Sequence, residues 1–178
     1  AEVERVLSVL DGVILVISAV EGVQAQTRIL MKALQRLKVP TIIFVNKIDR
    51  MGARYEELLR DISNKLTPDI TAMGTVENLG TKEAKFKLVD LKDASGIPVF
   101  FGSAITNTGI ESLTDSIKKL KPVKRTEDLY GSVFKVERGE NSEKIAYVRM
   151  FSGSIHIRDQ LEFGKVTAIN TFKDGTVP

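Results

Sequence analysis

Apolar residues along roughly the first two thirds of the chain follow two different spacings. Three short runs are rich in β-branched or aromatic residues, which predicts buried strands over 13–17, 41–45 and 97–101. Between and beyond these runs, apolar residues recur every three or four positions. This spacing predicts helices over 27–37, 54–66 and 108–120, and the end of another helix before Asp11. Strands and helices therefore alternate, as in an α/β parallel sheet with helices on both faces.

The predicted helices each have one apolar side that we expect to pack against the sheet. These inward positions are Leu30, Ala33, Leu34 and Leu37, then Leu58, Leu59 and Ile62, and finally Ile110, Leu113 and Ile117. The strand over 13–17 is uniformly apolar, so we expect it to be covered on both faces. The stretch 67–95 has no sustained period, and we expect an irregular insertion with at most one short strand or helix.

After Asp128 the pattern changes to short strand-like runs separated by turn residues. The runs are 132–136, 144–150 and 155–157. They predict an antiparallel all-β unit, a small barrel that is incomplete at Pro178. Because Pro122 ends the last predicted helix, we divide the chain into an α/β domain over 1–122 and a β-barrel domain over 123–178.

The composition is that of an ordinary globular protein, and it narrows the function classes. Of the 178 residues, 43% are hydrophobic and 28% are charged, and the lack of cysteine excludes disulfides and thiolate metal sites. No apolar run is long enough to cross a membrane. The net charge of +3 is compatible with an RNA-rich partner. We expect the single histidine, His156, to be structural, and we assign no catalytic or metal-ligating residue.

Basic residues gather where the predicted α/β domain ends. They are Lys118, Lys119, Lys121, Lys124 and Arg125. We favour a solvated helix end, where cations suit the helix dipole, over a patch that contacts phosphates.

The tetrapeptide Asn46-Lys47-Ile48-Asp49 follows the predicted strand 41–45 and has the most specific chemistry in the chain. The Asp49 carboxylate can accept two hydrogen bonds at once, from N1–H and from the exocyclic N2 amine of guanine. Adenine has neither donor and would leave the carboxylate desolvated and unpaired, which costs far more than a weak contact gains. The Lys47 stem can lie over the base, and the Asn46 amide can tie neighbouring loops together.

A second turn of small residues, Gly102-Ser103-Ala104, follows the predicted strand 97–101. It can present backbone N–H groups to the guanine O6. Ligands of parallel sheets bind beyond the carboxyl ends of the strands, which is where both turns are expected. The sequence therefore predicts a guanine site formed by Asn46, Lys47, Asp49, Ser103 and Ala104.

The two turns resemble the fourth and fifth motifs of the GTPase superfamily, and the sequence around them is more specific. The segments 8–12, 17–27 and 44–50 are similar to the translational GTPases related to elongation factor G. The segments 133–136 and 147–153 are similar to the β-barrel domain that follows the GTPase domain in that family. Within the family, 24–30 and 145–149 resemble most the ribosomal protection proteins that confer tetracycline resistance.

The resemblance implies a truncated P-loop GTPase domain that binds GTP or GDP, with Mg²⁺ expected only in the full-length protein. It also implies GTP-driven binding to the ribosome in the cytoplasm, release of tetracycline and GTP hydrolysis on departure, with no membrane or DNA partner. Two alternatives remain open. One is elongation factor G or a paralogue that acts in translocation, and the other is a non-catalytic module that binds nucleotide or the ribosome.

The sequence departs from the family's pattern at the residues that bind phosphates. No Gly-x-x-x-x-Gly-Lys-Ser/Thr motif occurs, so we expect no phosphate cradle here. The Asp-x-x-Gly strings that begin at Asp49, Asp93 and Asp128 are not credible magnesium motifs, because the first belongs to the base-recognition motif and the others lie too late in the chain. We therefore expect these residues to recognise the base and not to catalyse phosphoryl transfer.

In this superfamily the phosphate-loop strand pairs with the strand that corresponds to 13–17, and without it that strand has an open edge. We predict that a protein beginning at Ala1 associates or is poorly soluble. Size-exclusion chromatography with light scattering measures this, and a monodisperse monomer would contradict the prediction.

Overall fold

A computed structural model describes residues 2–7, 9–89, 95–119, 128–172 and 176–177 of the chain. The chain divides into two compact units, residues 1–122 and residues 123–178.

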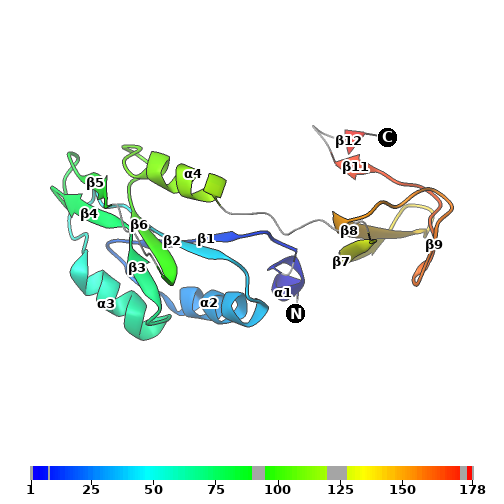
Figure 1. The fold of residues 1–178 in the computed structure, drawn as a ribbon, viewed down its shortest axis with the longest axis horizontal. Coiled ribbons are helices and arrows are strands. Elements are labelled where there is room, and N and C mark those ends of the chain that lie inside the picture. Colours follow the sequence, from blue (N-terminus) through cyan, green and yellow to red (C-terminus); the bar gives the residue numbers. More distant parts are fainter. Residues whose placement is uncertain (1, 8, 90–94, 120–127, 173–175, 178) are drawn as a thin grey trace. The chain divides into compact units, whose positions relative to one another are not determined.

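The first unit is built on a parallel four-stranded sheet (Figure 1). The strands are β1 (Val13–Ser18), β2 (Thr41–Asn46), β6 (Ile97–Phe101) and β3 (Ile70–Ala72), in that spatial order. Helices α2 (Ala25–Leu37) and α3 (Glu56–Lys65) cover one face and α4 (Ile110–Lys119) covers the other, while the short α1 (Glu2–Leu7) precedes β1. The predicted parallel sheet with helices on both faces is therefore confirmed.

Alternation along the strands divides the core of this unit into two layers. Leu15, Ile17, Ile43, Val45, Val99 and Phe101 point to the side of α2 and α3, where they pack with Met31, Leu58 and Ile62. Ile42, Phe44 and Phe100 point to the other side, where they pack with Leu113 and Ile110 of α4. The central strands β2 and β6 are thus buried on both faces, which explains why their sequences are continuously apolar.

The expectation that strand 13–17 is covered on both faces is wrong. In β1 only Leu15 and Ile17 are buried, whereas Ile14 is 39% exposed and Val16 is 56% exposed. The reason is positional, because β1 lies at one edge of the sheet and α4 packs on residues of β2 and β6. Continuous apolarity in the sequence therefore did not distinguish an edge strand from a central one.

The predicted inner faces of the helices are partly confirmed. Leu58 and Ile62 of α3 and Leu113 of α4 are buried as expected, but Ile117 is 38% exposed. In α2 the buried side chains are Thr27, Met31 and Leu34, while Leu30, Ala33 and Leu37 are only half-buried. The buried face of α2 therefore follows an i, i+4, i+7 spacing. Of the predicted residues, Leu34 lies on this face and the others lie beside it.

The expectation for residues 67–95 is also wrong. Instead of an irregular insertion, this segment supplies β3 to the main sheet and then an antiparallel hairpin of β4 (Gly74–Glu77) and β5 (Lys85–Leu88). These strands are short and half exposed, so their sequences mix apolar and polar residues without a clear period. Residues 90–94, which belong to the same predicted insertion, lie outside the described residues.

The second unit is rich in antiparallel strands. Its described residues form three two-stranded sheets, and the longest pairs β7 (Tyr130–Arg138) with β8 (Lys144–Ser152). The others pair β9 (Gln160–Leu161) with β10 (Gly164–Lys165) and β11 (Thr171–Phe172) with β12 (Thr176–Val177). The predicted strand over 155–157 is wrong, because the Asp159 carboxylate accepts a hydrogen bond from the His156 N–H at 2.7 Å and makes a local turn.

A charged cluster lies on the β7–β8 hairpin. The Lys135 ammonium lies 2.6 Å from the Glu137 carboxylate, which also accepts a hydrogen bond from the Tyr147 hydroxyl. The hydrogen bond from Lys135, followed by that from Tyr147, lowers the pKa of the Glu137 carboxyl. Since Tyr147 lies on β8 and Glu137 on β7, their hydrogen bond is a cross-strand interaction within the hairpin, whereas Lys135 and Glu137 pair along one strand.

Of the basic residues near Pro122, Lys118 forms an ion pair with Asp115 at 2.9 Å on α4. Lys121, Lys124 and Arg125 lie outside the described residues. Among the helices that the structure describes, none has the length and apolar character needed to cross a membrane.

Candidate nucleotide site

The two predicted turns emerge side by side from the central strands of the sheet. Strands β2 and β6 are parallel and paired, with Val45 opposite Phe101. The residues that follow each strand, 46–49 and 102–104, therefore leave the sheet at the same edge. The structure brings the predicted site residues together in this way.

The Asn46 side chain joins the two turns directly. Its Oδ1 atom accepts a hydrogen bond from Lys47 N at 2.8 Å and another from Ala104 N at 3.1 Å. Two backbone hydrogen bonds reinforce the contact, from Gly102 N to Val45 O at 2.9 Å and from Ile48 N to Gly102 O at 3.2 Å. The predicted role of the Asn46 amide in tying loops together agrees with these contacts.

The turn after β6 is held by its own polar groups. Ser103 is 1% exposed, and its hydroxyl oxygen accepts hydrogen bonds from Ile105 N at 3.2 Å and Thr106 N at 3.3 Å. The Ser103 N–H donates to Thr108 O at 3.0 Å, and the Ala104 N–H donates to Asn46. The four N–H groups from 103 to 106 thus have partners within the protein, so contact with a guanine O6 requires one of them to be shared or released.

Lys47 lies in an unusual backbone conformation at the start of the first turn. Its φ is +71°, in the left-handed region that non-glycine residues seldom adopt. Its ammonium lies 3.6 Å from the carboxylate of Glu21, in the loop after β1. Because both side chains are well exposed, the pair is weak and leaves the lysine stem available for other contacts. Sequence reasoning did not identify Glu21, because nothing local marks it as a neighbour of Lys47.

The Asp49 carboxylate is the one feature of the site that the protein itself does not satisfy. Its Oδ1 atom is buried and has no hydrogen-bond partner among the described residues. A buried acceptor without a donor is costly, and each case in a native protein needs an explanation. A ligand that presents N–H donors to this carboxylate supplies one, provided that the atoms covering Oδ1 move aside when the ligand binds. The residues present therefore fit a guanine nucleotide.

Gly102 leaves no room for a side chain at the centre of the site. A Cβ atom at this residue would lie 2.4 Å from Thr108 O and 2.8 Å from Cζ of Phe44. We expect Gly102→Ala to displace the turn and to lower the free energy of unfolding by about 2 kcal/mol, as overpacking does. Urea denaturation measures the change, with Glu111→Ala on the exposed side of α4 as a control. Equal stability of the two variants would contradict the expectation.

Comparison with known protein families shows which family this chain belongs to. The profile of the family described as "Elongation factor Tu GTP binding domain" matches residues 1–123. The chain belongs to this family. The match covers the whole first unit, including both turns of the site and the β4–β5 hairpin.

Curated relatives of this elongation factor Tu-type domain include antibiotic resistance proteins. The chain is 38% identical to the oxytetracycline resistance protein of Streptomyces rimosus over 99% of its own length and 36% of that protein. It is 36% identical to the tetracycline resistance protein TetP of Clostridium perfringens, with 99% and 35% covered, and 37% identical to TetM of Streptomyces lividans, with 92% and 33% covered. The predicted resemblance to tetracycline resistance proteins is confirmed, and the chain spans about a third of the length of these relatives.

Solved structures support the fold of the elongation factor Tu-type chain. A crystal structure of a Thermus thermophilus protein matches with a TM-score of 0.67, covering 94% of this chain and 36% of that one at 20% identity. At this identity the similarity supports the fold alone.

Proposed function

We propose that this chain is the guanine-recognition part of a ribosome-dependent GTPase that protects the ribosome from tetracycline. Membership of the elongation factor Tu GTP-binding family supports the nucleotide, and the resistance proteins among the relatives support the biological role. These relatives also favour tetracycline protection over the alternative of an elongation factor that acts in translocation.

The buried, unpartnered Oδ1 atom of Asp49 is the observation on which the proposed specificity rests. In our proposal the carboxylate accepts hydrogen bonds from N1–H and the N2 amine of guanine, while the Lys47 stem covers the base. Asn46 holds the two turns together, and Ser103 and Ala104 shape the second turn. An adenine ring presents no donor to Asp49, so it would leave the carboxylate buried and unpaired.

The residues of this chain serve base recognition, and phosphate chemistry belongs to the proposed full-length enzyme. A bound GTP supplies the phosphoanhydride bond that is hydrolysed. The sequence has no Gly-x-x-x-x-Gly-Lys-Ser/Thr motif, which cradles phosphates in other GTPases. We therefore propose that phosphate and Mg²⁺ binding in the full-length protein depend on residues other than those described here. Action on the ribosome places the protein in the cytoplasm.

Two experiments on the full-length protein test the proposal. Equilibrium titration with fluorescent GDP and ADP measures base preference, and we expect binding of GDP with ADP at least about a hundredfold weaker. In cells treated with tetracycline, we expect expression to restore translation without replacing elongation factor G. Equal binding of GDP and ADP would refute guanine recognition, while rescue of an elongation factor G defect would favour a role in translocation.

A further inference from the structure

The β4–β5 hairpin contacts the middle of the Asn46–Asp49 turn. The N–H of Gly80, in the loop between β4 and β5, donates to the carbonyl oxygen of Ile48 at 2.8 Å. Ile48 lies between Lys47 and Asp49, and its side chain is fully buried. Its own N–H donates to Gly102 O at 3.2 Å. The main chain between the two proposed base-contacting side chains is therefore held from opposite sides, by the hairpin and by the second turn.

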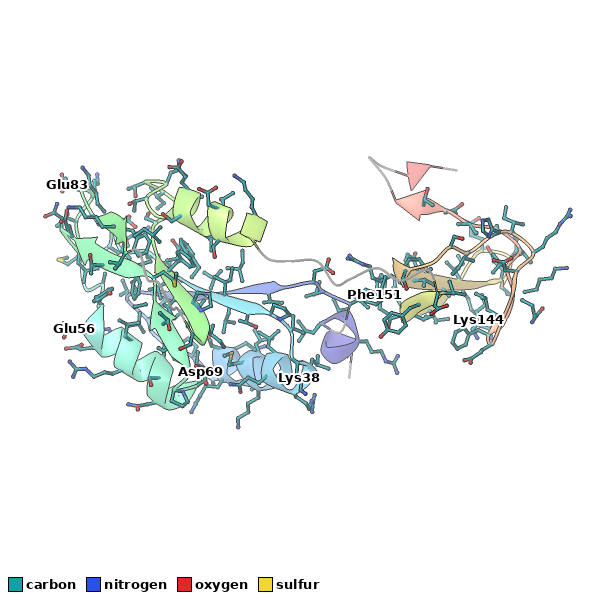
Figure 2. The ribbon with its side chains drawn as sticks, in the orientation of Figure 1. Lys38, Glu56, Asp69, Glu83, Lys144 and Phe151 are labelled. Atoms are coloured by element: carbon teal, nitrogen blue, oxygen red, sulfur yellow. The ribbon has the colours of Figure 1, made fainter. Side chains whose placement is uncertain are left out.

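The loop that presents the Gly80 N–H is itself well fixed. Its two bends use left-handed backbone, with φ of +51° at Asn78 and +84° at Gly80. The Thr81 hydroxyl donates to Asn78 O at 2.8 Å, and Ala84 N donates to Thr81 O at 3.0 Å. Leu79 and the buried Ala84 pack against the core on the side of α2 and α3. Figure 2 shows this loop at one end of the unit, where Glu83 is labelled.

The same hairpin also reaches the second turn. The Phe86 N–H, in β5, donates to the hydroxyl oxygen of Thr108 at 3.2 Å. The carbonyl oxygen of Thr108 accepts the Ser103 N–H at 3.0 Å, and Phe86 packs against residues of both core layers. The hairpin thus bonds directly to the first turn, through the Gly80 N–H, and is linked to the second turn through Thr108, which accepts from both Phe86 and Ser103.

We propose that the β4–β5 hairpin positions the guanine-recognition turns, with Gly80 as the main positioning residue and Thr108 as a second attachment. The Gly80 N–H fixes the Ile48 carbonyl and so sets the direction in which the Asp49 carboxylate points. Only with this direction fixed can the carboxylate accept from N1–H and the N2 amine together. This inference rests on the proposed guanine binding, and it adds a determinant outside both base-recognition motifs.

The role of Gly80 can be tested by two substitutions whose side chains differ in how well they tolerate a positive φ. A Cβ at Gly80 meets only ordinary contacts, at 3.5 Å from Arg50 O and 3.8 Å from Cα of Met51, so the backbone conformation is the main constraint. Gly80→Val strongly disfavours a φ of +84°, whereas Gly80→Asn tolerates positive φ and keeps the same N–H. Thr108→Val removes the acceptor of the Phe86 N–H. Thr114→Val is the matched control, because the Thr114 hydroxyl bonds within α4 in the contacts that the structure describes.

The measurement is the ratio of GDP to IDP affinity in the full-length protein, because hypoxanthine keeps N1–H and lacks the N2 amine. We expect Gly80→Val to lower this ratio by about tenfold, which corresponds to loss of one charge-assisted hydrogen bond. Gly80→Asn should restore the ratio to within about twofold of the unmodified protein, since Asn accepts left-handed backbone. Thr108→Val should lower the ratio by about threefold, as expected for a distant neutral hydrogen bond, and Thr114→Val should not change it.

The outcomes separate the two proposals. If the unmodified protein prefers GDP to IDP and Gly80→Val weakens both by the same factor, the hairpin only stabilises the fold and the positioning role is overturned. If Gly80→Val does not fold, the comparison of Thr108→Val with Thr114→Val decides in the same way. If the unmodified protein shows no preference between GDP and IDP, guanine recognition by Asp49 fails, and the positioning role fails with it.

Discussion

Replacing Asp49 by Asn should reverse the base preference of the full-length protein from guanine to xanthine. The Asn amide places an N–H donor where the carboxylate accepted, so it opposes the N2 amine of guanine and complements the C2 oxygen of xanthine. We expect GDP affinity to fall by about a thousandfold, because two hydrogen bonds to a buried charged acceptor are lost and unpaired groups remain. Competition between GDP and XDP for one fluorescent nucleotide measures the change.

Asp115→Asn is the matched control for this substitution. It makes the same chemical change on the exposed surface of α4, where Asp115 pairs with Lys118. We expect it to leave both affinities unchanged, because exposed ion pairs contribute little. If Asp49→Asn also left the preference for guanine over xanthine unchanged, Asp49 would not contact the edge of the base.

The second large effect is expected at Asn46, which joins the turns. Asn46→Ala removes the acceptor of both the Lys47 N–H at 2.8 Å and the Ala104 N–H at 3.1 Å. We expect a loss of about 3 kcal/mol in the free energy of unfolding of the first unit, since two backbone donors lose their partner. GDP affinity should fall by about a hundredfold, because the turns are no longer held in register. Urea denaturation and nucleotide titration measure the two effects.

Asn46→Asp distinguishes the role of the oxygen from that of the amide as a whole. The carboxylate keeps an acceptor at the position of Oδ1, so both backbone hydrogen bonds can persist. We expect this variant to keep most of the stability that Asn46→Ala loses. Equal losses in the two variants would show that the amide nitrogen of Asn46, rather than its Oδ1 atom, holds the turns.

Strands and turns that are marked by a local sequence pattern could be predicted from the sequence. The uninterrupted apolar runs of β2 and β6 indicated buried parallel strands, because a strand covered on both faces has no polar side. Parallel strands place their carboxyl ends at one edge, so the turns at Asn46 and Ser103 were expected to be neighbours. The Asn46 contact to Ala104 agrees with that expectation.

Local sequence patterns gave wrong predictions where the burial or pairing of a segment depends on neighbours that are distant in the chain. The apolar run of β1 indicated two covered faces, but its edge position leaves Ile14 and Val16 exposed. The segment 67–95 showed no period, yet it supplies β3, which pairs with β6 in the main sheet, and the β4–β5 hairpin, whose two strands pair with each other. Short, half-exposed strands gain their stability from pairing, which leaves little trace in their own composition.

The sequence alone determined the α/β class, the order of the main strands and helices, and the two turns that carry Asn46, Asp49 and Ser103, because these follow from periodicity and from short motifs. The tertiary structure alone decided that Asp49 has a buried acceptor without a donor and that Gly80 holds the Ile48 carbonyl. The physical reason is that hydrogen bonding and burial at a site depend on which distant segments fold against it. No local run of residues encodes that arrangement.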